Sequence, residues 1–68
     1  MNIGTVKWFN RTKGYGLISP RDGGKDVFVF YPTIETDGHQ TLEFGQTVRY
    51  ESVDCLHGER TVRVVPVN

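Results

Sequence analysis

Short stretches rich in Val, Ile, Thr and aromatic residues alternate along the chain with turns that contain glycine. Such residues fit a pleated, half-buried surface, and no window has the period of an amphipathic helix. The pattern predicts five strands, at residues 3–10, 15–19, 27–30, 47–54 and 60–65. Because closure removes exposed strand edges, five short strands in 68 residues favour an all-β fold, a small closed or nearly closed barrel.

Alternation within these strands separates an aliphatic side from an aromatic one. The aliphatic side is expected to form the barrel core and consists of Ile18, Val27, Val29, Val48, Val62 and Val64. The aromatic residues Tyr15, Phe28 and Phe30 then face outward. Since an exposed cluster of rings usually marks a binding surface, this side is the predicted binding site.

The pattern gives less information on where the remaining aromatic side chains lie. Simple alternation puts Trp8 on the same side as Val6, and a bulge or sharp bend in the strand would turn it outward. The sequence leaves both orientations open. Phe44 and Tyr50 are remote from the aromatic cluster, and we expect them to be packing residues.

Charge changes the picture once it is followed along the chain. Eight basic and eight acidic residues give zero net charge, which argues against binding by bulk attraction to phosphate. However, residues 1–25 carry a net charge of +4, residues 26–59 carry −6, and the rest carry +2. The basic segment also contains Trp8 and Tyr15. Aromatic rings can stack on unpaired bases, and neighbouring cations can contact phosphates. The combination therefore predicts binding of single-stranded RNA or DNA.

Other classes of function find little support. The single cysteine, Cys55, cannot form an internal disulfide, and neither a signal-peptide pattern nor an apolar span of about 20 residues is present, so we expect a cytoplasmic protein with no membrane partner. Cys55 and His57 are too few for a zinc site. We therefore expect no metal, no cofactor, no small-molecule substrate and no enzymatic activity. A nuclease that uses His39 or His57 as a general acid or base is the weakest alternative.

Three segments resemble the signature of the cold-shock domain family: residues 4–10 (GTVKWFN), 13–18 (KGYGLI) and 26–31 (DVFVFY). The second and third are similar to the two ribonucleoprotein motifs of that family. Residues 37–42 and 44–48 resemble later family segments in the same order, so the resemblance spans nearly the whole chain. It implies one domain over residues 1–68, a five-stranded antiparallel barrel of the oligonucleotide-binding (OB) type.

The resemblance also implies roles for individual residues. Gly14 and Gly16 would permit a tight turn and a close approach of the backbone. Trp8, Tyr15, Phe28 and Phe30 would be stacking platforms, and Phe9 and Tyr31 would border them. Lys7 and Lys13 would lie near phosphates, and Asn10 and Asp26 would form hydrogen bonds with base edges.

Three candidate binding residues depart from the family pattern. Leu17 stands where a phenylalanine is usual, which removes one ring from the centre of the aromatic cluster. Phe30 replaces the usual histidine, and His39 replaces a loop phenylalanine, so it would stack less strongly. These departures predict weaker binding than that of a typical member.

The sequence therefore predicts an RNA chaperone that holds unpaired bases, disfavours secondary structure and bears on transcription or translation. The main alternative is a small barrel that docks peptides on the same aromatic cluster. We expect a monomer for the most part, and a dimer is the alternative because an exposed apolar face can pair.

Overall fold

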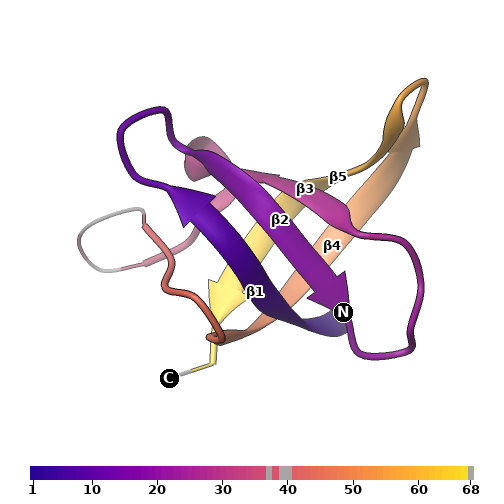
Figure 1. The fold of residues 1–68 in the computed structure, drawn as a ribbon, viewed down its shortest axis with the longest axis horizontal. Helices are drawn as coiled ribbons and strands as arrows, with labels where there is room; N and C mark the ends of the chain where they lie inside the picture. Colours follow the sequence, from indigo (N-terminus) through magenta and orange to yellow (C-terminus); the bar gives the residue numbers. More distant parts are fainter. Residues whose placement is uncertain (37, 39–40, 68) are drawn as a thin grey trace.

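The computed structural model describes residues 1–36, 38 and 41–67. Its elements, shown in Figure 1, are β1 (Asn2–Asn10), β2 (Tyr15–Pro20), β3 (Val27–Phe30), the 3-10 turn η1 (Tyr31–Thr33), β4 (Thr47–Cys55) and β5 (Gly58–Pro66). The five predicted strands are confirmed, and each end lies within two residues of its expected position. The short turn η1 was not expected from the sequence. No helix in the described part of the chain is long and apolar enough to cross a membrane.

The strands close into a barrel in the order β1-β2-β3-β5-β4, with β4 paired back to β1 (Figure 1). This confirms the predicted five-stranded barrel. Four of the five strand contacts are antiparallel, and the contact between β3 and β5 is parallel. In that parallel contact Phe28 lies opposite Arg60, so closure brings the β4–β5 hairpin beside β3.

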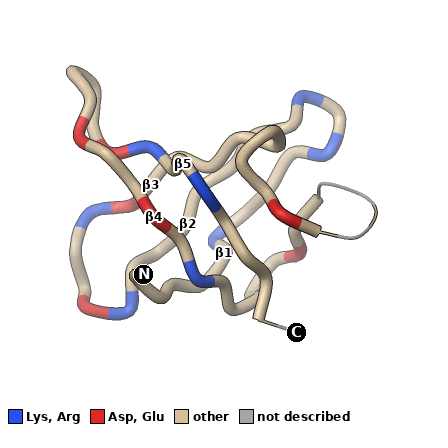
Figure 2. Tube along the Cα trace, turned by 180° about the vertical axis from the view of Figure 1, so that it is seen from behind, with Lys and Arg blue, Asp and Glu red and all other residues tan. Residues whose placement is uncertain are grey.

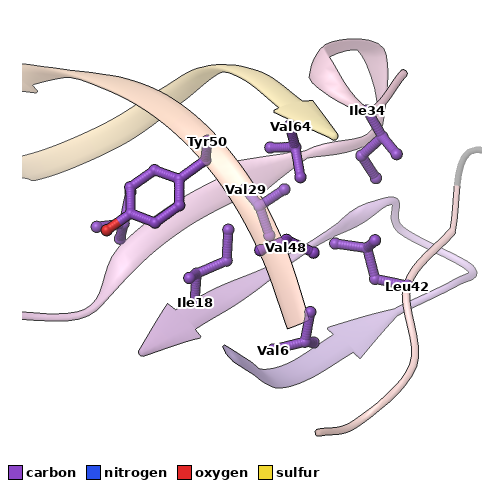
Figure 3. Close-up of a cluster of buried hydrophobic side chains, with 9 residues drawn as sticks. Val6, Ile18, Val29, Ile34, Leu42, Val48, Tyr50 and Val64 are labelled. Atoms are coloured by element: carbon purple, nitrogen blue, oxygen red, sulfur yellow. The ribbon is translucent and has the colours of Figure 1, made fainter. Parts of the chain in front are cut away.

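The barrel interior is filled by apolar side chains from every strand and from the long connection between β3 and β4 (Figure 3). The buried set is Val6, Ile18, Val27, Val29, Ile34, Leu42, Val48, Tyr50 and Val64. Five of the six aliphatic residues expected in the core belong to it. Complete burial of such a side chain contributes about 1.5–3 kcal/mol, so this cluster accounts for much of the stability of the fold.

The sixth expected core residue, Val62, is 47% exposed, so its prediction was wrong. The cause is a β-bulge in the β4–β5 pair. Glu51 lies opposite Arg63, but the next residue, Ser52, lies opposite Thr61, which leaves Val62 as the extra residue. An extra residue shifts the alternation of the strand and turns Val62 outward.

The two rings expected to be packing residues have opposite outcomes. Tyr50 is 2% exposed and lies among the core side chains, as predicted (Figure 3). Burial, and then the negative charges of Glu59 and Asp22, raise the pKa of Tyr50 above its ordinary value. Phe44 is 84% exposed, so its prediction was wrong. It lies in a turn before β4, and turns run over the surface of a domain.

Candidate nucleic-acid interface

The orientation of Trp8, which alternation left open, is decided by a second bulge. Val6 pairs with Ile18 on β2, whereas Trp8 pairs with Leu17, so Lys7 is the extra residue of β1. Val6 is buried in the core, and Trp8 is 39% exposed on the outer surface. The bulge therefore places Trp8 on the same side of the sheet as the rings of β2 and β3.

Two rows of side chains cross the outer surface of β1, β2 and β3. The first row consists of Trp8, Leu17 and Phe28, which lie opposite one another in register. The second row consists of Asn10, Tyr15 and Phe30. We call the surface formed by these two rows the ring face. Leu17 occupies the centre of the first row, between two aromatic residues.

The rings of the ring face contact one another in pairs. Trp8 and Tyr15 meet edge to face, with centroids 5.6 Å apart and an interplanar angle of 77°. Phe28 and Phe30 are nearly parallel, at 6.2 Å and 19°. Both phenylalanines remain 38–40% exposed. Exposed rings of this kind offer flat surfaces to which unpaired bases can stack.

The turn between β1 and β2 borders the ring face. Gly14 has a φ of 77°, a conformation that favours glycine, and a Cβ there would lie 2.6 Å from the Tyr31 ring. The Tyr31 amide donates a hydrogen bond of 2.9 Å to the Gly14 carbonyl. A Cβ at Gly16 would collide with the Trp8 carbonyl oxygen. These are the tight turn and the close backbone approach expected of the two glycines.

A shallow pocket of about 380 Å³ opens between this turn and η1. Its lining consists of Arg11, Thr12, Lys13, Gly14 and Tyr31. Lys13 and the half-exposed Tyr31 thus lie side by side at one end of the ring face. A cation beside a ring suits a nucleotide, whose phosphate and base need the two kinds of contact.

The other polar candidates have partners within the protein. Lys7 Nζ donates a hydrogen bond of 2.9 Å to Asp26 Oδ2, which joins two predicted binding residues in one exposed ion pair. Asn10 Oδ1 accepts a 2.9 Å hydrogen bond from the Lys13 amide and so holds the β1–β2 turn.

Two further candidates lie elsewhere. Phe9 is half-buried and packs against the core. His39 lies outside the described residues.

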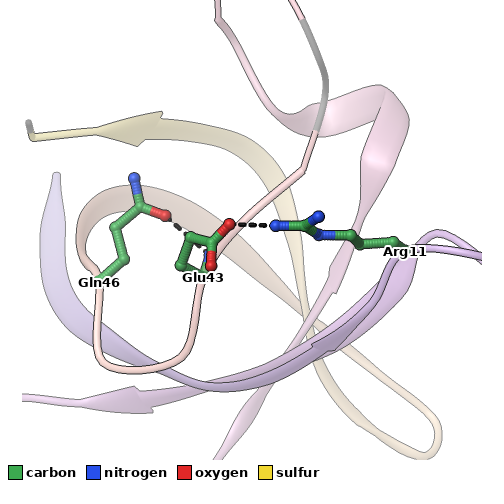
Figure 4. Close-up of polar contacts among 3 residues, drawn as sticks. All are labelled: Arg11, Glu43 and Gln46. Carbon is green, nitrogen blue, oxygen red and sulfur yellow. Dashed lines mark hydrogen bonds and ion pairs between the residues drawn. The ribbon is translucent and has the colours of Figure 1, made fainter.

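A further ion pair ties the β1–β2 turn to the segment that precedes β4 (Figure 4). Arg11 pairs with Glu43, whose amide donates a 3.0 Å hydrogen bond to Gln46 Oε1. This pair compensates another positive charge of the basic segment. In contrast, Lys13 and Lys25 form no ion pair with a carboxylate in the part of the chain that the structure describes.

The outer surface of β4 and β5 has a different character. Acidic and basic positions lie close together along these strands (Figure 2). Arg63 lies 2.7 Å from Glu35 and 3.9 Å from Glu51, and the hydrogen bond to Glu35 raises the pKa of Arg63. We call the surface formed by Arg49, Glu51 and Arg63 the charged face.

A second pocket was missed by the sequence reasoning. It has a volume of about 230 Å³ and is lined by Phe28 and Phe30 from β3 and by Cys55, His57, Gly58, Glu59 and Arg60 from the β4–β5 hairpin. We call it the hairpin slot. Sequence reasoning considered Cys55 and His57 only for metal or nucleophile chemistry, and the described residues contain no cluster of three or more metal-ligating side chains. The slot forms because β5 pairs with β3, a contact between distant parts of the chain.

Comparison with known sequences gives one consistent result. Residues 2–67 match the profile of the 'Cold-shock' DNA-binding domain. The chain is 46% identical over 67 residues to cold shock-like protein CspD of Escherichia coli K12, covering 98% of this chain and 90% of that protein. It is 47% identical over 62 residues to cold shock-like protein CspE of the same strain, covering 91% and 90%. Cold shock protein 1 of Lactiplantibacillus plantarum is 50% identical over 66 residues, covering 97% and 98%.

Proposed function

The chain belongs to the cold-shock DNA-binding domain family and is a nucleic-acid-binding protein, and we propose that it holds single-stranded RNA or DNA on the ring face. The observation that carries the proposal is the outward orientation of Trp8 on β1 and of Phe28 and Phe30 on β3, on either side of β2. Each ring that stacks on an unpaired base contributes about 1–3 kcal/mol. A duplex hides its base faces and therefore gains nothing from this surface.

Attraction to phosphates contributes less to the binding free energy than stacking does in this proposal. Lys13 lies beside Tyr31 and is the first candidate for a phosphate contact. Lys7 would have to exchange its Asp26 carboxylate for a phosphate, and Arg11 would have to exchange Glu43, so these two contacts gain less than a free cation would. Release of the Asp26 carboxylate would in turn make it available to a donor on a base edge.

The mode of action that fits such binding is that of an RNA chaperone. Bases held on the ring face are removed from base pairing, so the protein disfavours secondary structure and needs neither ATP nor a catalytic group. Through this effect on RNA structure it would act on transcription or translation. We propose no enzymatic activity. The family match favours this function over a barrel that docks peptides.

The remaining features of the proposal concern the protein as a whole. Residues 1–68 would act as one binding module, mostly as a monomer. A cytoplasmic location suits a chain whose only cysteine, Cys55, is an exposed free thiol, since cytosolic thiols are kept reduced.

The fluorescence of Trp8, the only tryptophan, provides the test. It is titrated with a pyrimidine heptamer, with the same heptamer in a duplex, and with a proline-rich peptide. We expect quenching by the single strand alone. If the peptide quenches the fluorescence and no single strand does, the proposal of nucleic-acid stacking is wrong and this surface docks peptides instead.

Chaperone action is measured separately with an RNA hairpin that carries a fluorophore and a quencher at its ends. We expect the protein to open the hairpin without ATP, and a Phe28→Ala, Phe30→Ala double variant to lose most of this effect. RNA cleavage in the same assay would contradict the non-enzymatic proposal.

A further inference from the structure

The hairpin slot extends the ring face toward the β4–β5 hairpin. One side is formed by the nearly parallel rings of Phe28 and Phe30. The other is formed by residues 55 and 57–60. Arg60 lies opposite Phe28 in the parallel contact, so it continues the row that begins at Trp8. A strand that follows this row on the surface would reach the slot next.

Arg60 is held in place at the slot by a neighbouring side chain. Its Nε donates a 3.1 Å hydrogen bond to Cys55 Sγ, which also lines the slot. The described residues place no carboxylate within ion-pair distance of Arg60, in contrast to Lys7, Arg11 and Arg63. The Cys55 bond thus orients the terminal nitrogens of the guanidinium, and among residues 1–36, 38 and 41–67 no carboxylate forms an ion pair with them.

The surroundings of Arg60 favour a base over a phosphate. Two phenylalanine rings form the floor, and a phosphate gains nothing from an apolar surface. Glu59 also lines the slot, with Oε2 fixed by a 2.6 Å hydrogen bond from Ser52 Oγ, and its charge repels phosphate. A flat, uncharged group that accepts hydrogen bonds suits the two rings and the guanidinium, and it avoids the repulsion that Glu59 exerts on an anion.

We infer that the hairpin slot is a guanine-preferring base site in which Arg60 selects the base. This inference rests on the proposed binding of single strands. Guanine carries adjacent acceptors, O6 and N7, that match two donors of one guanidinium, and its double ring can cover both phenylalanines.

The other bases fit the slot less well. Adenine places an amino donor beside N7, which faces a guanidinium donor with another donor. Uracil and thymine present carbonyl oxygens on either side of a ring N–H, so one guanidinium meets a single acceptor. Cytosine has two neighbouring acceptors, N3 and O2, but its single ring covers less of the floor. Cytosine is therefore the expected second choice.

The experiment uses pyrimidine heptamers that differ only at the central position, which is guanine, 7-deazaguanine, adenine, cytosine or uracil. Affinities are measured by Trp8 fluorescence. A bidentate contact discriminates by about 1–3 kcal/mol, so we expect guanine to bind about fivefold or more tightly than adenine or uracil. 7-Deazaguanine keeps its ring size and O6 but lacks the N7 acceptor, and it should lose most of this advantage.

Three variants assign the preference to the guanidinium. Arg60→Ala should reduce the ratio of guanine to uracil affinity to about one, and Arg60→Lys should do nearly the same, because an ammonium keeps the charge but not the paired donors. Arg49→Ala is the matched control, since Arg49 lies opposite Ile3 and Val65 at the far end of β4 from the hairpin. It should leave the ratio unchanged.

Cys55 supplies an independent readout as the single thiol of the chain. A guanine heptamer should slow alkylation of Cys55 by iodoacetamide several times more than a uracil heptamer, and Arg60→Ala should abolish the difference. Equal affinity for all heptamers, or a preference that survives Arg60→Ala, would overturn the inference while single-strand binding stands. Failure to bind any heptamer would instead refute the proposed function.

Discussion

The ring face and the charged face are two outer surfaces of the same barrel, and they differ in the side chains that they expose to solvent. On the ring face, Trp8, Phe28 and Phe30 are exposed and Tyr15 and Leu17 are half-buried. The ion pairs of the described residues leave Lys13, which lies beside these side chains, without a carboxylate partner. On the charged face, Arg63 is bracketed by Glu35 and Glu51. The first surface leaves rings and a cation open to a ligand, whereas the second compensates Arg63 within the protein.

This difference explains how a chain of zero net charge can bind a polyanion. The net charge is a sum over the whole molecule, and it does not distinguish the ion-paired Arg63 of the charged face from the rings and cations of the ring face. On the charged face, the carboxylates of Glu35 and Glu51 compensate Arg63, so this surface attracts phosphate weakly and would leave the strand to the ring face. Zero net charge is thus compatible with the proposed binding, in which stacking on the ring face contributes more than attraction to phosphate.

The strongest test of the comparison removes one ring. Phe28→Ala should weaken single-strand binding by about 1–3 kcal/mol, roughly 5- to 150-fold, because one stacked base loses its platform. The free energy of unfolding should change little, since the ring is 40% exposed. Arg49→Ala, on the charged face at the far end of β4 from the hairpin, is the control, and we expect its effect on affinity to stay below about twofold. Equal losses in the two variants would abolish the distinction between the faces.

A salt titration separates the contribution of phosphates. If about three phosphates are contacted, log K should fall with log [salt] with a slope near −2, about a sixteenfold loss between 50 and 200 mM. Lys13→Gln should reduce the slope by about 0.7, and Arg63→Gln on the charged face should leave it unchanged. A much steeper slope in the parent protein would mean that electrostatics dominates.

Most of the fold was accessible from the sequence because strand signals are local. Branched and aromatic residues between glycine turns located all five strands, and the alternation in β3 correctly separated Val27 and Val29 from Phe28 and Phe30. Where it failed, a bulge was responsible. The position of a bulge depends on how two strands pair, so neither the outward turn of Trp8 nor that of Val62 could be derived from one strand alone.

The outward placement of the candidate rings was predictable to the same extent as the strands that carry them. The rings of β2 and β3 were identified from their own alternation. The hairpin slot was not, because Arg60 reaches Phe28 only through the parallel contact that closes the barrel. The pairing of Lys7 with Asp26 also escaped prediction, since the two residues come from different segments that the fold brings together.

Rings inside and outside the barrel should differ in their response to alkaline pH. The folded state raises the pKa of Tyr50 above the value of 10.0 expected in an unfolded chain, chiefly through burial. The unfolded state therefore loses this proton first as the pH rises. The contribution of Tyr50 to stability is complete below pH 10 and is lost as the pH rises through the folded-state pKa.

Denaturant titrations at pH 8, 10 and 11 measure this effect. The free energy of unfolding should fall above pH 10, and the fall should be shallower in Tyr50→Phe, which has no phenol to ionise. Tyr31→Phe is the control, because Tyr31 is half exposed on the surface. Parallel curves for the parent protein and Tyr50→Phe would show that burial of Tyr50 is not linked to alkaline unfolding.

The smallest expected effect is a gain, and it examines the ring face at its centre. Leu17 lies between Trp8 and Phe28 in the first row, where it interrupts a continuous series of rings. Leu17→Phe adds a platform on an already half-exposed position, so it should strengthen single-strand binding by about two- to fivefold without disturbing the core. The matched control, Val67→Phe, adds the same ring to an exposed position after β5, at the end of the barrel where the Val67 amide donates a hydrogen bond to the Thr47 carbonyl, and should leave affinity unchanged. If both substitutions raise affinity equally, added apolar surface is sufficient by itself, and the alignment of rings in rows is not what binds the strand.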